Sequence, residues 1–131
     1  MYDNGFTLYG IEELIGKTLT SAVNIDNEEL VFTTTEGDVY KLLHVQDCCE
    51  TVYMRDITGD LQDLVGSEIL LAEEVSSDHT PAGYDEEYYD SFTWTFYKLA
   101  TLKGYVDLSW LGTSNGYYSE GVDFIKMDRV Q

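Results

Sequence analysis

Hydrophobic and polar positions alternate with a period of two over most of the chain, which is the pattern of half-buried β-strands. The alternation predicts strands at residues 18–25, 29–35, 38–45, 51–57, 67–75, 92–102, 105–111 and 117–127. The clearest signal is a hairpin across residues 29–45, where Glu36-Gly37 forms a turn between β-branched and aromatic runs. A second glycine-rich turn at 112–116 predicts a hairpin that returns the chain into 117–127.

Two segments have apolar residues three and four apart between glycines, which predicts short helices at 11–16 and 59–66. Asp60 precedes the second of them and is expected to cap it. The sum is about seven or eight short strands in sequential hairpins with two short helices. This favours a single α+β domain over residues 1–131, mainly antiparallel, with a strongly curved sheet or partial barrel.

The composition changes over residues 76–90, which hold the single proline, several acids and three tyrosines but no branched aliphatic residue. We expect a long acidic surface loop there. Tyrosine combines a large apolar face with a polar tip, which suits interfaces. The candidate partner-binding residues of this loop are Asp78, Tyr84, Asp85, Glu86, Glu87, Tyr88 and Tyr89.

Acidic residues outnumber basic ones by 25 to 7, giving a formal charge of −18, and no Lys or Arg occurs from Asp56 to Tyr97. This charge argues against direct nucleic-acid binding and against anionic membranes. The negative surface either keeps the protein soluble or acts as an electrostatic decoy that imitates nucleic-acid phosphates. The second interpretation predicts a partner with a basic groove.

The first ten residues lack the features of a secretory signal, and no apolar run approaches the roughly 20 residues of a membrane span. We therefore expect a cytoplasmic protein, with Cys48 and Cys49 as reduced thiols because neighbouring strand residues point to opposite faces. Exposed strand edges make a homodimer an option, and the oligomeric state stays open.

No phosphate-binding loop, catalytic triad order or metalloprotease helix is present. We expect no catalytic residue and no cofactor, and hence a protein that is not an enzyme. His44 and Cys48 are weak candidates for a metal site, because their spacing does not supply four ligands. A metal-dependent hydrolase built on them is the least favoured alternative.

A second functional alternative is an aromatic pocket that sequesters a nucleotide-type signal, with bases stacking on rings and cations holding phosphates. Alternation places Trp94, Phe96 and Lys98 on one face of their strand. The candidate residues of this pocket are Arg55, Trp94, Tyr97, Lys98, Lys103, Trp110 and Tyr118.

Four segments carry distinctive motifs: HxQDCCE from His44, GDLxDLxG from Gly59, TWTFYKLAT from Thr93 and SNGYYSE from Ser114. Together they resemble a family of small acidic proteins of unknown function found mainly in bacteriophages and prophages, over roughly residues 14–124. The resemblance supplies no catalytic residue. It implies a phage-type accessory protein that inhibits a host antiviral defence protein or nucleoprotein, which is an association and not a chemical argument.

Overall fold

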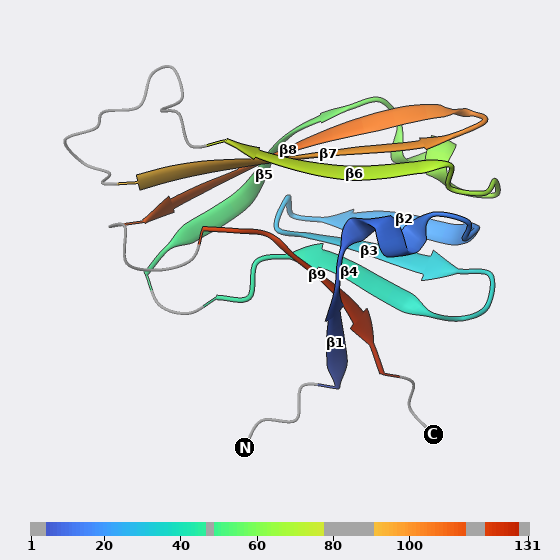
Figure 1. Ribbon diagram of the computed structural model, residues 1–131, viewed down its shortest axis with the longest axis horizontal. Helices are drawn as coiled ribbons and strands as arrows, with labels where there is room; N and C mark the ends of the chain where they lie inside the picture. Colours follow the sequence, from blue (N-terminus) through green and yellow to red (C-terminus); the bar gives the residue numbers. More distant parts are fainter. Residues whose placement is uncertain (1–4, 47–48, 78–90, 115–119, 129–131) are drawn as a thin grey trace.

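The computed structural model describes residues 5–46, 49–77, 91–114 and 120–128. It is a sandwich of two antiparallel sheets that lie one above the other (Figure 1). The five-stranded sheet has the order β1-β9-β4-β3-β2, and the four-stranded sheet has the order β5-β8-β7-β6. The strands are β1 (Phe6–Tyr9), β2 (Leu19–Ile25), β3 (Glu29–Thr34), β4 (Val39–Leu43), β5 (Thr51–Thr58), β6 (Leu71–Ser77), β7 (Ser91–Thr101), β8 (Gly104–Ser114) and β9 (Asp123–Met127).

The predicted fold class is wrong in two respects. Both helical segments are single 3₁₀ turns, η1 (Ile11–Leu14) and η2 (Leu61–Leu64), because each lies between glycines that leave too few residues to nucleate an α-helix. The domain is therefore an all-β sandwich and not α+β. Both sheets are open and neither is strongly curved or closed, so the described residues form no partial barrel (Figure 1).

The hairpin predicted across residues 29–45 is confirmed as β3 and β4, with Thr33 opposite Val39. Gly37 in its turn has a φ of +89°, a conformation that glycine adopts at little steric cost. Asp60 also caps η2 as expected, since its Oδ1 accepts a hydrogen bond from the Gln62 N–H at 2.9 Å.

The second predicted hairpin is wrong. β8 continues through the glycine of the expected turn, Gly112, to Ser114, and the chain then crosses to the other sheet. There β9 pairs with both β1 and β4. Because β9 pairs with strands far away in the sequence, no local turn signal could reveal its partners.

The core lies between the sheets and is built from the inward-facing side chains of every second strand position. Tyr40 and Phe32 come from the five-stranded sheet and Tyr97 and Trp110 from the four-stranded sheet, each no more than 1% exposed. Among the described residues, no helix has the length and apolar character that a membrane crossing requires.

Candidate binding face

The outward-pointing side chains of β6, β7 and β8 form a regular grid on the four-stranded sheet. Strand register places Glu73 opposite Lys98 and Lys98 opposite Asp107, which makes one charged row. The next row runs through Val75, Phe96 and Ser109. We call these six residues the outer face: Glu73, Val75, Phe96, Lys98, Asp107 and Ser109.

The outer face combines an exposed aliphatic side chain, Val75, with the half-buried ring of Phe96. Val75 is 61% exposed, and the same six residues line a hollow of about 410 Å³ together with Tyr97 and Leu108. Next to it the Trp94 and Phe96 rings stack with a centroid distance of 5.7 Å and an interplanar angle of 8°. Solvent-accessible apolar and aromatic groups bordered by charged ones are typical of surfaces that bind a partner.

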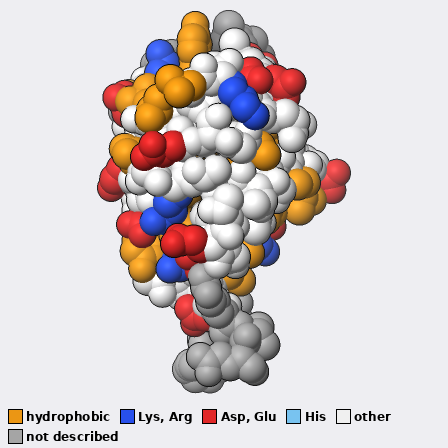
Figure 2. Space-filling view, turned by 90° about the vertical axis from the view of Figure 1, so that its right-hand side faces the viewer, with side chains coloured by type: hydrophobic (Ala, Val, Ile, Leu, Met, Phe, Trp, Pro, Cys, Tyr) orange, Lys and Arg blue, Asp and Glu red, His pale blue; other side chains and the backbone are white. Residues whose placement is uncertain are grey.

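The charged row has two carboxylates for one ammonium group. Lys98 forms no ion pair within 4 Å in the described part of the chain, and its Nζ lies 5.6 Å from the centroid of the Tyr105 ring. The row is therefore net negative and favours a cationic ligand group over a phosphate. At the end of the molecule shown in Figure 2, acidic side chains are mixed with Lys, Arg and hydrophobic groups.

Several of the other lysines are neutralised locally. Lys17 pairs with Glu13, Lys41 with Glu29 and Lys126 with Asp38, at N–O distances of 3.9, 3.2 and 3.9 Å. These three lysines therefore offset carboxylates on or near the five-stranded sheet. Exposed acids of the other sheet and its flanking turns, such as Asp56, Glu73 and Glu74, add to its negative charge.

The structure brings together only part of the predicted nucleotide pocket. Trp94 and Lys98 lie on the outward side of β7, as alternation predicts, whereas Tyr97 and Trp110 face the core. Lys103 lies after β7 and its Nζ donates to the Val65 carbonyl at 2.6 Å. Arg55 is an exposed residue at a bulge of β5. Tyr118 lies outside the described residues.

The predicted partner-binding loop also lies outside the described residues. This holds for all seven candidates: Asp78, Tyr84, Asp85, Glu86, Glu87, Tyr88 and Tyr89. The two strands that flank it, β6 and β7, are those that carry most of the outer face.

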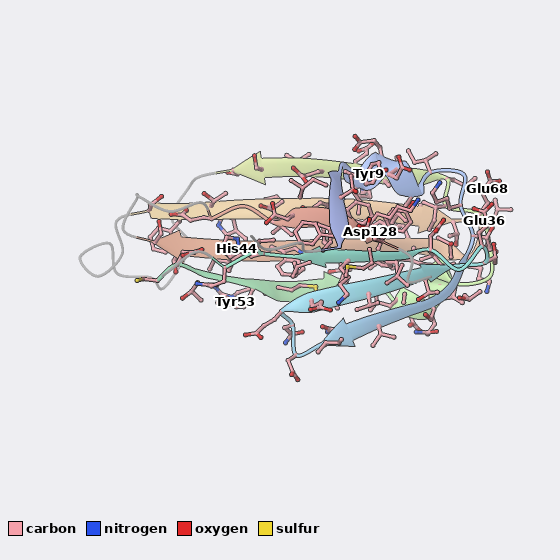
Figure 3. The ribbon with its side chains drawn as sticks, turned by 90° about the horizontal axis from the view of Figure 1, so that it is seen from below. Tyr9, Glu36, His44, Tyr53, Glu68 and Asp128 are labelled. Carbon is pink, nitrogen blue, oxygen red and sulfur yellow. The ribbon has the colours of Figure 1, made fainter. Side chains whose placement is uncertain are left out.

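His44 belongs to a buried polar network between the two sheets. It follows β4, and its Nδ1 lies 2.7 Å from the Gly121 carbonyl while its Nε2 lies 2.6 Å from Oε2 of Glu50, just before β5. Because a carbonyl oxygen can only accept, Nδ1 donates a hydrogen bond to Gly121, while Nε2 faces the Glu50 carboxylate. Figure 3 shows His44 toward the end of the sandwich that lies opposite Glu36 and Glu68.

Glu120 anchors a second set of hydrogen bonds beside this network. Its Oε1 accepts from the Thr93 hydroxyl at 2.8 Å and its Oε2 from the Ser114 hydroxyl. Glu50 and Glu120 are buried, 3% and 7% exposed. Three of the four sequence motifs therefore meet at one end of the sandwich, joined by the hydrogen bonds of these buried carboxylates.

The weak metal candidates do not form a site in the described residues. Both ring nitrogens of His44 already face protein oxygens, and Cys48 lies outside the described residues. No group of three or more His, Cys, Asp or Glu suited to a metal occurs within residues 5–46, 49–77, 91–114 and 120–128. Cys49 is disulfide-bonded, so the expectation of reduced thiols is wrong for it.

Sequence reasoning missed four outer-face residues: Glu73, Val75, Asp107 and Ser109. Alternation gave the side on which Phe96 and Lys98 lie, but it could not give the register between strands. That register alone places the carboxylates of β6 and β8 on either side of Lys98.

Fold and face together define a small all-β sandwich with an amphipathic, net-negative outer face. A family model described as a domain of unknown function, DUF7448, matches residues 12–124, and the chain belongs to this family. No curated protein and no solved structure matches this chain.

Proposed function

We propose that the protein is a non-enzymatic accessory protein that binds a positively charged surface of a protein partner through its outer face. The observation that supports this most directly is the strand register that sets Glu73, Lys98 and Asp107 beside Val75 and Phe96. Apolar and aromatic groups supply contact area, and the excess of carboxylates favours Lys and Arg on the partner.

We further propose that the partner is a host antiviral defence protein or nucleoprotein and that this protein inhibits it by occupying its basic nucleic-acid groove. The support is the resemblance to phage and prophage proteins and the charge of −18. An acidic partner also gains association rate from the field around a basic groove. Action in the host cytoplasm belongs to the same proposal.

The nucleotide-sequestering alternative has less support. Its one described cation on the outer face, Lys98, lies between two carboxylates in strand register, which disfavours a phosphate group. Tyr97 and Trp110, which were expected to stack on a base, are 1% and 0% exposed.

Capture from a lysate of a defence-carrying bacterial host tests the proposal. The immobilised wild type is compared with the variant Glu73→Gln/Asp107→Asn and with a control that loses the same charge, Glu28→Gln/Asp128→Asn. In the control, Glu28 directly precedes β3 and Asp128 directly follows β9, both strands of the five-stranded sheet. We expect the wild type and the control to retain a basic protein that about 0.5 M salt releases, and the outer-face variant to lose it. Equal capture by all three proteins contradicts the proposal.

The inhibitory role needs a separate readout. A host that carries the defence system and expresses the wild type is expected to plate a restricted phage more efficiently than one that expresses Glu73→Gln/Asp107→Asn. No difference between the two hosts contradicts the role in counter-defence, even if capture succeeds.

A further inference from the structure

β6 is the edge strand of the four-stranded sheet that borders the outer face. In the described part of the chain it pairs with β7 alone, in an unbroken register from Leu71 opposite Ala100 to Ser77 opposite Trp94. An edge strand presents a row of backbone N–H and C=O groups to any chain that can pair with it.

The second half of β6 extends beyond the cover of the other sheet. Ala72 is 3% exposed, but the four residues Glu73, Glu74, Val75 and Ser76 are all exposed. In a strand that covers a core, every second residue is buried. Because these four are exposed in succession, both faces of β6 are accessible there as well as its edge.

The other three edge strands carry features that hinder pairing. β1 has four residues, β2 has a register shift between Leu19 and Ser21, and β5 has one between Met54 and Asp56. Short length and bulges both protect edges from added strands. β6 has seven residues and shows neither a bulge nor a proline.

The protection that β6 does have is charge. Glu73 and Glu74 are adjacent on the strand, and it contains no cation. Two copies paired antiparallel about this point would place carboxylates opposite carboxylates, which is unfavourable. The same two groups attract a strand that carries Lys or Arg, so this edge resists self-association and accepts a basic segment.

We propose that the β6 edge binds an extended segment of the partner as an added strand. The segment has consecutive basic, basic and apolar residues opposite Glu73, Glu74 and Val75. This inference rests on the proposed function and specifies the binding mode. Side chains opposite Glu73 and Val75 lie beside the hollow of the outer face, and the one between them meets Glu74 on the other side of the sheet. Backbone hydrogen bonds supply affinity and the three side chains supply selectivity.

Fluorescence anisotropy with an end-capped peptide tests this mode. The probe consists of alternating Thr and Val around a central Val-Lys-Arg, the order that an added antiparallel strand needs to place Val opposite Val75 and Arg opposite Glu73. A second peptide has the same sequence with N-methyl groups on those three central residues. N-methylation removes the N–H donors and keeps the side chains. We expect it to weaken binding at least about tenfold. Equal binding of both peptides, or no binding of the parent, overturns strand addition.

The same anisotropy measurement with variants of the protein tests whether the peptide binds at β6. We expect Glu73→Lys/Glu74→Lys to weaken binding of the parent peptide by about tenfold or more, and Glu28→Lys/Asp128→Lys to change it less than about twofold. Equal losses in both variants would reflect net charge and overturn the assignment to β6. The lysate capture with Glu73→Gln/Asp107→Asn is scored separately, so strand addition can fail while docking through the outer face stands.

Discussion

The His44 ring and the Glu50 carboxylate are hydrogen-bonded at 2.6 Å between the two sheets, with side chains 4% and 0% exposed. One residue follows the last β4 position of the five-stranded sheet, and the other precedes the first β5 position of the four-stranded sheet. The pair therefore fixes the point where the chain changes sheets.

Removing one member of this pair leaves the other buried without its partner. We expect His44→Ala or Glu50→Ala to lower the free energy of unfolding by about 1–3 kcal/mol, because a buried polar group loses a hydrogen-bond partner, as measured by urea denaturation. The double variant should lose less than the sum of the two, because the residues are in contact. Lys17→Ala, at the surface pair with Glu13, should cost under about 1 kcal/mol. Similar losses for Lys17→Ala and His44→Ala would contradict this.

Gly112 is buried where the chain passes close to β8 after the crossover. A Cβ at this position would lie 2.4 Å from the Glu120 carbonyl oxygen and 2.7 Å from the Glu120 Cβ. We expect Gly112→Ala to lower stability by about 1–3 kcal/mol through this clash, measured by thermal and urea unfolding. Ser109→Ala, at an outward position of the same strand, is the control. A Gly112→Ala protein as stable as the control would show that the backbone at Glu120 can shift to admit the Cβ with no loss in the free energy of unfolding.

Because of Tyr40, we expect the free energy of unfolding to fall as the pH rises into the alkaline range. Burial chiefly, with nearby carboxylates such as Glu13, raises the pKa of its hydroxyl from 10.0 to about 12. Because the folded pKa is raised, the stabilisation is complete below about pH 10 and is lost as the pH rises to about 12. Between these values the unfolded chain has released a proton that the folded chain keeps, so stability falls by about 1.4 kcal/mol per pH unit.

Tyr40→Phe should reduce this slope, measured by urea denaturation at pH values from about 9 to about 12. Burial and the nearby Glu74 carboxylate also raise the pKa of Tyr97, so part of the slope should remain in this variant. An unchanged slope in Tyr40→Phe would mean that its hydroxyl does not titrate differently in the folded state.

The outer face should contribute little to stability. Val75 is 61% exposed, so Val75→Ser should change the free energy of unfolding by under about 0.5 kcal/mol while weakening peptide binding. Leu99, on the neighbouring strand, is 0% exposed, and Leu99→Ala should cost about 2–5 kcal/mol. A large loss of stability in Val75→Ser would identify the residue as part of the core.

Local patterns predicted what local interactions determine. The β3–β4 hairpin is confirmed because its alternation and its glycine turn lie within one short segment. β1 was not predicted because its four residues are too few for a recognisable alternation, and only pairing with the distant β9 makes them a strand. The helices shortened to 3₁₀ turns because a four-residue segment can present an apolar face without sustaining an α-helix.

Long-range pairing was beyond the sequence pattern. Nothing local distinguishes a β9 that returns beside β8 from one that crosses to lie between β1 and β4. The candidate site shows the same division. Alternation placed Phe96 and Lys98 on one side of β7, but their carboxylate neighbours Glu73 and Asp107 depend on pairing with β6 and β8.

The position of β9 between β1 and β4 also imposes an order on biosynthesis. The N-terminal strand β1 pairs with β9 and with no other strand of the described chain, so it must wait while residues 10–122 are translated. The ribosome has to release residues 123–127 before the five-stranded sheet can be completed. The nascent chain therefore exposes an unfinished sheet for most of its synthesis, the stage at which chaperones protect such edges from aggregation.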